Sequence, residues 1–206
     1  TGSKAEFIFR KTASKASFCI AGSTFLYDYL KKINSKTAYL APGIDLEVFK
    51  PAKNREDKPP SALWVGTMFK EEDYLNLKFL FEILKYFPTL NVEIIGNGTY
   101  KEKISEQLKI LNLDNIRLKG WIDHNSLIEY LDSFEIGFLP IAVENNFMKA
   151  KFPVKAIEMM AKGIVVISSC YGEAKQIIRH GESGMLAKDG SEFKENLKII
   201  INDKKK

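Results

Sequence analysis

The stretch Lys149-Ala-Lys-Phe-Pro-Val-Lys-Ala-Ile-Glu-Met-Met-Ala-Lys-Gly163, followed by the apolar run Ile164-Val-Val-Ile-Ser168, decides the fold of this chain. Pro153 suits the first turn of a helix, because its φ is fixed and its missing N–H would have no intrahelical partner there. A helix is therefore predicted to start near residue 152. Gly163 is a natural left-handed terminator, and the β-branched run after it predicts a buried strand.

Lys155 and Glu158 lie three residues apart, so the predicted helix places them on one face near its positively polarised end. This arrangement suits a ligand that carries phosphates and hydroxyls.

The same alternation of strand and helix repeats through the second part of the chain. Short apolar strands alternating with amphipathic helices specify a parallel sheet with right-handed crossovers and helices on both faces. The fold class is therefore α/β, a doubly wound, Rossmann-like parallel sheet. The predicted strands are 62–65, 92–95, 116–118, 135–139 and 164–168, and the predicted helices are 74–87, 101–112, 125–132, 153–162, 173–180 and 191–202.

The first part of the chain is organised differently. Helical spacing over residues 4–17, a short strand at 18–21, a helix at 24–32 that Ser23 caps, and a strand at 37–41 precede a polar, proline-punctuated stretch. We divide the chain into residues 1–52, the end of a preceding domain with an interdomain segment; residues 53–60, a linker; and residues 61–206, the Rossmann-like domain.

Composition excludes several classes of protein. A chain of 206 residues with 45% hydrophobic residues can bury a core, and no apolar run approaches the roughly 20 residues of a membrane-spanning helix. No signal peptide is visible, so a cytoplasmic location is expected. The net charge of +5 gives weak support to nucleic-acid binding, and we predict none. The dispersed lysines are as compatible with peripheral contact with an anionic membrane, at its inner face.

Metal and disulfide chemistry are not expected. Cys19 and Cys170 are far apart and share no metal-type spacing with His124 or His180. Two reduced, buried thiols and no metal site are therefore predicted.

In an open parallel sheet, ligands bind outside the carboxyl ends of the strands, so the strand-to-helix loops are the expected functional sites. Four of these loops carry glycine where the strand ends, which allows backbone N–H groups to approach a ligand. None matches the dinucleotide fingerprint or the nucleotide P-loop, so dehydrogenase and ATPase activities lack their defining residues. The loops are Gly66–Phe69, Gly96–Thr99, Gly120–Asp123, Pro140–Lys151 and Ser169–Gly172.

The order of these loops carries a family resemblance. The segments concerned are Ala21-Gly-Ser-Thr-Phe-Leu-Tyr-Asp-Tyr-Leu30, Leu40-Ala-Pro-Gly-Ile-Asp45 with Phe49 and Pro51, Leu63-Trp-Val-Gly66, Ile94-Ile-Gly-Asn-Gly98, Ile116-Arg-Leu-Lys-Gly120, Phe138-Leu-Pro140, Glu158-Met-Met-Ala-Lys-Gly163 and His180-Gly-Glu-Ser-Gly184. Together they resemble the C-terminal, donor-binding domain of the group 1 nucleotide-sugar glycosyltransferases, whose two-Rossmann fold is called GT-B. The resemblance covers roughly residues 14 to 200.

The resemblance implies a donor-binding site. Glu158 looks like the glutamate that binds the ribose hydroxyls, and a carboxylate can accept two hydrogen bonds from a cis-diol. Lys155 looks like a phosphate-contacting lysine, adding its charge to the helix that starts near Phe152 and Pro153. The resemblance also implies that loop amides contact the donor. These amides belong to Gly66, Thr67 and Met68 at the diphosphate and to Trp121 and Ile122 at the base.

The chain departs from the family pattern at three polar positions. Ala150 replaces a glutamate that usually holds the donor sugar, and Thr67 and Leu75 replace an arginine and a lysine that usually reach the diphosphate. Nearby Lys70, Lys149 or Lys151 could substitute electrostatically. The loop Gly66–Phe69 together with the pattern of Pro153, Lys155 and Glu158 is more similar to divergent members such as the glucuronosyltransferases of exopolysaccharide assembly, which favours a UDP-sugar donor.

The remaining polar residues near the expected site are less informative. His124 and His180 are expected at helix ends and not as catalytic bases. Gln176 stands where the family often carries a glutamate, and the roles of Glu173 and Lys175 stay open.

The resemblance implies transfer of a sugar from an NDP-sugar, with the UDP form expected, to a polysaccharide or lipid-linked acceptor, with retention of configuration. No catalytic residue is assigned, and no cofactor is expected besides the substrate. A first Rossmann-like domain is the expected partner, since only its end fits before Phe18, and this chain is expected to bind nucleotide yet transfer little. Two alternatives remain: a non-catalytic nucleotide-sugar sensor or scaffold, and a GT-B-like epimerase.

Overall fold

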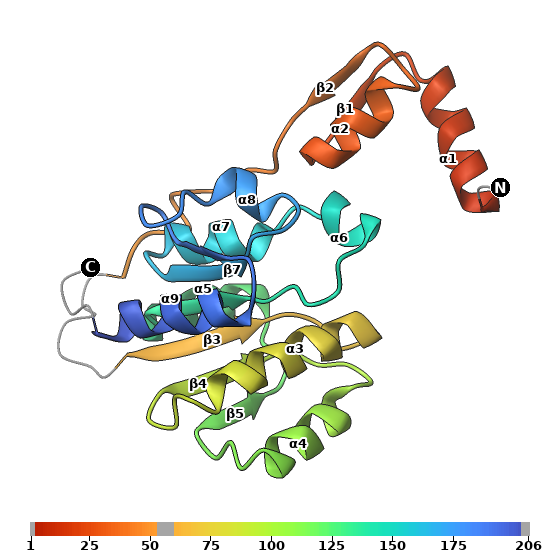
Figure 1. Cartoon of the computed structure of the whole chain (residues 1–206). Coiled ribbons are helices and arrows are strands. Elements are labelled where there is room, and N and C mark those ends of the chain that lie inside the picture. Colours follow the sequence, from red (N-terminus) through yellow and green to blue (C-terminus); the bar gives the residue numbers. More distant parts are fainter. Residues whose placement is uncertain (1–2, 53–59, 203–206) are drawn as a thin grey trace.

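The computed structural model describes residues 3–52 and 60–202 (Figure 1). The first part forms a small unit of its own. It contains helix α1 (Lys4–Lys15), strand β1 (Cys19–Ala21), helix α2 (Thr24–Lys31) and strand β2 (Thr37–Tyr39), and the two strands pair in parallel. Ala13, Cys19, Ala21 and Leu30 form its buried core. We call residues 3–39 the N-terminal unit.

The second part is built on one six-stranded parallel sheet. The spatial order is β5-β4-β3-β6-β7-β8, so the sequence order reverses between β3 and β6. This topology confirms the doubly wound α/β fold that the alternating pattern predicts. The strands are β3 (Ser61–Val65), β4 (Asn91–Ile95), β5 (Ile116–Lys119), β6 (Ile136–Leu139), β7 (Val165–Ser169) and β8 (Met185–Ala187).

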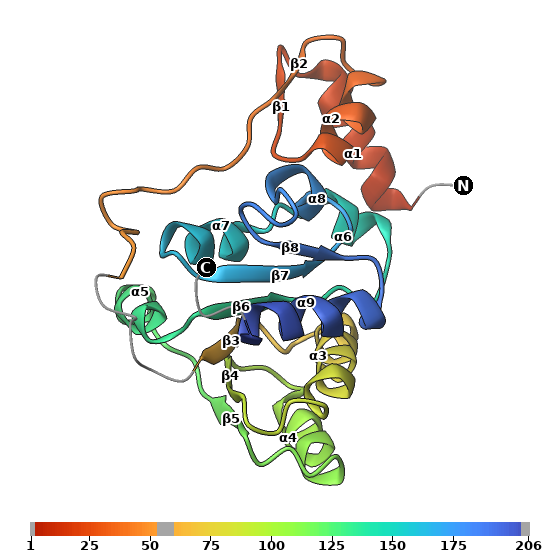
Figure 2. The same ribbon diagram turned by 60° about the vertical axis from the view of Figure 1, so that its left-hand side comes forward.

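Helices cover both faces of the sheet, as Figure 2 shows. Helices α3 (Glu71–Leu84), α4 (Lys101–Ile110) and α9 (Gly190–Asn202) lie on one face, over the larger core cluster. Helices α5 (His124–Tyr130) and α7 (Val154–Ala161) lie on the other, where Leu63 and Val166 belong to the second cluster. Three short helical segments complete the chain: η1 (Leu131–Ser133), α6 (Asn146–Ala150) and α8 (Ala174–Ile177).

Helix α7 and strand β7 arise from the stretch that decides the fold. The helix begins at Val154 and not near residue 152, because Pro153 has a non-helical ψ of 70° and stands just before the first turn. It ends at Ala161, and Gly163, which follows the C-cap residue Lys162, has a φ of +74°. The Gly163 N–H donates to the Met160 carbonyl and the Ile164 N–H to the Met159 carbonyl, which is the Schellman arrangement that glycine permits.

Four details differ from the sequence-based expectation. Strand β8 and helix α6 were not predicted, since three and five residues are too short to show a period. Helix α8 ends at Ile177 instead of residue 180, and α3 begins three residues before the predicted position 74. The first turn of α3 is acidic and therefore lacks the apolar spacing used to locate it.

Two other expectations concern the linker and the thiols. Residues 53–59 of the predicted linker lie outside the described residues, so the domain division stays a prediction. Both cysteines are free; Cys19 is buried, whereas Cys170 is only half-buried, so the expectation of two buried thiols is correct for the first alone. Within residues 3–52 and 60–202, no helix is long and apolar enough to cross a bilayer.

Candidate functional site

The carboxyl edge of the sheet brings the loops after β3 and β4 into contact. The Gly66 N–H donates to the Ile95 carbonyl at 3.1 Å, and the Met68 N–H donates to the Asn97 carbonyl at 3.0 Å. Gly96 has a φ of +148°, and a Cβ there would lie 1.9 Å from the Gly66 carbonyl oxygen. Only glycine at position 96 allows the two loops to pack this closely.

These contacts correct the expected role of two of the three amides, those of Gly66 and Met68, while the role of the Thr67 amide stays a prediction. The N–H groups of Gly66 and Met68 are already bonded within the protein, and Met68 is fully buried. They are therefore not available to a diphosphate. Of the three residues, Thr67 is exposed, and its hydroxyl lies 3.5 Å from the Asp73 carboxylate.

Helix α7 presents Lys155 and Glu158 to the same side. The Lys155 Nζ lies 3.0 Å from Glu158 Oε2, and the exposed fractions of the two side chains are 40% and 9%. Glu158 is thus a largely buried carboxylate, not the solvated surface acid that is the simplest alternative for a helix glutamate. A buried carboxylate needs a partner, and the ammonium one turn earlier supplies one.

The residues around this pair are placed as follows. Phe152 and Pro153 are half-buried and lead into α7, and the Pro153 carbonyl accepts from the Ala156 N–H at 2.9 Å. Trp121, in the loop after β5, is 72% exposed and is therefore not a core aromatic. Ile122 beside it packs against the second core cluster. The donor-binding role of these residues stays a prediction.

Helix α6 carries Ala150, and side chains fix the loop that leads into it to the sheet edge. Ser169 Oγ accepts from the Ile141 N–H at 2.9 Å, and Asn76 Oδ1 accepts from the Ala142 N–H at 2.7 Å. The Lys70 ammonium lies 4.1 Å from the centroid of the Phe147 ring on α6. Lys70, one of the lysines expected to replace the missing basic contacts, is therefore held at this edge by a cation–π contact.

Glu173 is a residue whose role the sequence left open. It stands just before α8 and is 1% exposed. Its Oε2 accepts from the N–H and the hydroxyl of Thr24, both at 2.8 Å, and its Oε1 accepts from the Tyr39 hydroxyl at 2.8 Å. No sequence signal indicates this contact, because the partners are 149 and 134 residues away.

The two histidines take structural positions. His180 Nδ1 accepts from the Leu186 N–H at 3.0 Å, which fixes the turn between α8 and β8. His124 is the first residue of α5, and its ring centroid lies 6.0 Å from that of Phe49. Asp123 caps the same helix, and its hydrogen bonds from Ser126 lower the pKa of its carboxyl group.

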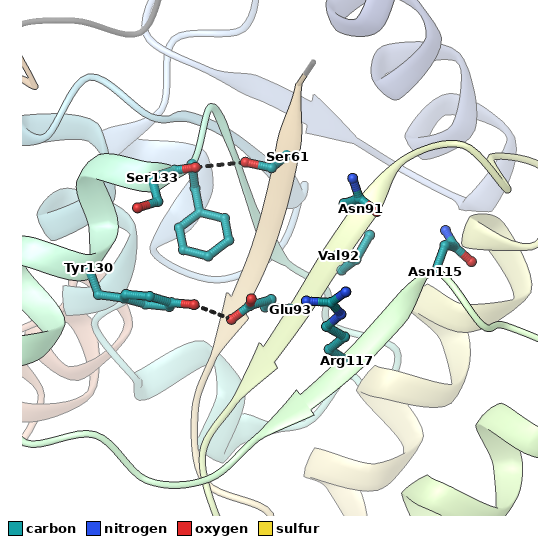
Figure 3. Close-up of a pocket in the computed structure, with 9 residues that line it drawn as sticks. Ser61, Asn91, Val92, Glu93, Asn115, Arg117, Tyr130 and Ser133 are labelled. Carbon is teal, nitrogen blue, oxygen red and sulfur yellow. Dashed lines mark hydrogen bonds between the residues drawn. The ribbon is translucent and has the colours of Figure 1, made fainter. Parts of the chain in front are cut away.

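A separate hollow of about 260 Å³ lies at the opposite edge, beside the amino ends of β3, β4 and β5 (Figure 3). There the Tyr130 hydroxyl donates to Glu93 Oε2 at 2.8 Å, with Asn91 and Arg117 on the neighbouring wall. The hollow shares no lining residue with α7. Among the residues that the structure describes, no group of three His, Cys, Asp or Glu side chains is arranged to hold a metal ion.

An open parallel sheet with a reversal in strand order defines a Rossmann-like domain, and helix α7 places a buried carboxylate paired with lysine at the carboxyl edge of that sheet. The family model described as "Glycosyl transferases group 1" matches residues 46–206, which is most of the chain. The chain belongs to this family.

Individual relatives are more distant. The chain is 30% identical over 147 residues to an uncharacterised glycosyltransferase of Haemophilus influenzae, covering 68% of this chain and 39% of the relative. It is 32% identical over 126 residues to the 2-deoxystreptamine N-acetyl-D-glucosaminyltransferase of Niallia circulans, covering 59% and 31%. The chain thus spans less than half the length of these curated relatives.

The fold has close structural counterparts. The structure of Anabaena HepE in complex with UDP and glucose superimposes with a TM-score of 0.81 at 16% identity, covering 98% of this chain and 59% of that chain. At this identity the likeness establishes the GT-B fold.

Proposed function

We propose that this chain is the donor-binding half of a glycosyltransferase that transfers a sugar from an NDP-sugar, with UDP as the nucleotide, to a polysaccharide or lipid-linked acceptor. The observation that carries the proposal is the buried Glu158 beside Lys155 on helix α7. A carboxylate and an ammonium on adjacent turns match the ribose hydroxyls and the diphosphate of one ligand.

The ion pair leaves room for both contacts. Lys155 Nζ approaches Oε2 of Glu158, so Oε1 remains to accept from a ribose hydroxyl. The Lys155 ammonium has three N–H donors, and 40% of the side chain is exposed. It can therefore keep its contact with Glu158 and also donate a hydrogen bond to a phosphate oxygen. Its charge adds to the field of the α7 N-terminus, which favours anions.

With these roles, Glu158 and Lys155 would support transfer by orienting the donor and by stabilising the charge on its diphosphate. As the bond from the anomeric carbon to the diphosphate oxygen breaks, negative charge grows on the diphosphate, and Lys155 and the start of α7 stabilise it. Glu158 holds the nucleoside, which fixes the sugar relative to the acceptor. The protein residues described form no carboxylate pair that we assign as nucleophile and acid.

Names of related proteins support a UDP-sugar as donor. HepE was solved with UDP and glucose, and the relative from Niallia circulans is named for transfer of N-acetylglucosamine. Exposed lysines at the sheet edge, including Lys149 and Lys151, would favour a phosphate-rich or acidic donor. The identity of the transferred sugar stays open.

An apolar surface on the N-terminal unit and on Leu40, the residue after it, supports a partner domain. Phe18, Ile20 and Leu40 are 55%, 62% and 63% exposed around the two-stranded sheet. A preceding Rossmann-like domain that continues this sheet would cover them and supply the acceptor site. The net charge of +5 is compatible with peripheral contact with an anionic membrane on its cytoplasmic side, where a lipid-linked acceptor is presented.

The test is a thermal-shift series on the 206-residue chain with UDP, GDP, ADP and their sugars. A ligand at 100 times its dissociation constant stabilises the folded state by about 2.7 kcal/mol. We expect UDP and UDP-sugars to raise the unfolding temperature most. A folded sample that shifts with none of these nucleotides would refute the donor site.

A non-catalytic nucleotide-sugar sensor is the second candidate, and Ala150 favours it, because the residue that usually holds the sugar is missing. The two candidates differ in turnover. A chain that includes the proposed first domain should release UDP from a UDP-sugar when acceptor is present if it is a transferase, and should only bind the nucleotide if it is a sensor.

A further inference from the structure

Glu173 is the most buried carboxylate at the boundary between the N-terminal unit and the six-stranded sheet, with 1% of its surface exposed. Burying a charge is costly unless it is paired and hydrogen-bonded. Here three donors at 2.8 Å, two on Thr24 and one on Tyr39, satisfy the two carboxylate oxygens. All three donors belong to the N-terminal unit, whereas Glu173 belongs to the sheet domain.

Glu173 provides an acceptor for the Thr24 N–H that helix α2 itself does not provide. Thr24 is the first residue of α2, and the first four N–H groups of a helix have no intrahelical partner. Ser23 Oγ accepts from the Leu26 N–H, and Glu173 accepts from the Thr24 N–H, so the cap of α2 is shared between the two parts of the chain. A negative charge at this end of a helix is also electrostatically favourable.

The contact joins two sheet edges of the same kind. Thr24 follows the carboxyl end of β1, Tyr39 is the last residue of β2, and Glu173 follows the carboxyl end of β7. The carboxyl edges of the two parallel sheets therefore face each other. Figures 1 and 2 show the N-terminal unit standing over α6 and α8, and α2 also contacts α6.

We propose that Glu173 is a positioning residue that holds the N-terminal unit over the carboxyl edge of the six-stranded sheet and so sets the separation of the two edges. The unit has its own core, so losing this carboxylate releases it as a body and does not unfold it. The proposal does not depend on the nature of the donor and is tested without nucleotide.

The hydrogen bond is tested by amide exchange in the Glu173→Ala variant of the 206-residue chain, followed by NMR. The Thr24 amide should exchange about tenfold faster or more, because its only acceptor is gone. The Tyr27 amide, which donates to the Ser23 carbonyl inside α2, should keep its rate. Unchanged exchange at Thr24, or equal acceleration of Thr24 and Tyr27, would overturn the proposal.

The positioning is tested by a distance between spin labels at Asp28→Cys on α2 and Lys109→Cys on α4, in a background with both native cysteines replaced by alanine. We expect a single narrow distribution that Glu173→Ala broadens. Glu182→Ala is the matched control, since this exposed glutamate contacts only Arg179 in its own segment, at 3.4 Å, and it should leave the distribution unchanged.

Tyr39→Phe gives a second variant that keeps the ring and removes one donor. Tyr39 is 40% exposed, so we expect the Tyr39→Phe variant to fold. The distribution should broaden less than in Glu173→Ala, and adding Tyr39→Phe to Glu173→Ala should change nothing further. If the distance distribution is unchanged in Glu173→Ala, Glu173 does not position the N-terminal unit. If Glu173→Ala does not fold, an unchanged distance distribution in Tyr39→Phe leads to the same conclusion.

Discussion

At the scale of single residues, Glu158 and Glu173 are buried carboxylates, and each is held by its own partners. The spacing of Lys155 and Glu158 predicts a shared helix face, and the structure confirms it with a contact of 3.0 Å. The burial of Glu158 was not predictable from that spacing, because it depends on the packing of α7 against β6 and β7. Glu173 shows the same limit more strongly, since its partners lie in another part of the chain.

The two residues of the α7 pair should respond differently to substitution. Glu158→Ala should weaken binding of UDP and UDP-sugar alike by about 1–3 kcal/mol, because the ribose hydroxyls lose a charged acceptor. Lys155→Ala should weaken UDP binding much more than uridine binding, because its charge meets the diphosphate. Calorimetric titration of both variants with uridine, UDP and a UDP-sugar measures this. Equal affinity for UDP in the wild type and both variants would contradict the assignment.

Tyr39 gives a pH-dependent residue prediction. Partial burial, the hydrogen bond to Glu173 and the negative charge of Glu173 all raise the pKa of the Tyr39 hydroxyl above its ordinary value near 10. The raised pKa favours the neutral form in the folded state, so its stabilising contribution is complete below the unfolded pKa and is lost as pH rises through the folded pKa.

Absorbance titration at tyrosinate wavelengths, with Tyr39→Phe to identify the residue by difference, measures this pKa. Glu173→Ala should move it down toward the ordinary value, whereas Glu182→Ala should leave it in place. A Tyr39 pKa that is the same with and without Glu173 would contradict the hydrogen bond.

At the scale of elements, long periodic segments were predictable and short ones were not. Helix α7, strand β7 and the alternating pattern around them follow from apolar spacing, Pro153 and Gly163. Strand β8 and helix α6 are positioned by contacts from elsewhere, such as the Asn196 amide with the Leu186 carbonyl in β8 and the Tyr171 hydroxyl with the carbonyl of Asn145, the N-cap of α6. Such contacts leave no period in the sequence.

The packing of the β3 and β4 loops makes an element-scale prediction. Gly96→Ala should destabilise the chain by roughly 2–4 kcal/mol, because the residue needs a φ of +148° and its Cβ would meet the Gly66 carbonyl oxygen. Gly120→Ala, in the neighbouring loop, has open space around its Cβ and should change stability by less than about 1 kcal/mol. Denaturant unfolding of both variants compares them, and similar losses would count against the tight loop contact.

At the scale of the whole molecule, the structure contains two parts with unequal amounts of buried surface. The sheet domain has apolar clusters on both faces of a six-stranded sheet, whereas the N-terminal unit has four buried apolar residues and several large exposed ones. Alternating strands and helices predicted the doubly wound sheet domain, except for strand β8 and helix α6. The same pattern could not predict the position of the N-terminal unit relative to the sheet domain, because that position depends on few contacts, including those of Glu173.

The exposed apolar surface of the N-terminal unit allows a final prediction about the whole molecule. Ile20, in the middle of β1, is 62% exposed. In the 206-residue chain, Ile20→Ser should therefore change the free energy of unfolding by no more than about 0.5 kcal/mol. In a chain that carries the proposed first domain, the same substitution should cost roughly 1.5–3 kcal/mol, because a covered isoleucine loses its apolar contacts.

Leu30→Ala is the control, since Leu30 is 7% exposed within the unit itself. It should cost about 2–5 kcal/mol in both chains, because its neighbours are the same in each. Denaturant unfolding of the four variants separates the cases. If Ile20→Ser lowers the free energy of unfolding equally little in both chains, the proposed first domain does not continue the β1–β2 sheet. That domain would then have to meet this chain, and supply the acceptor site, at another surface.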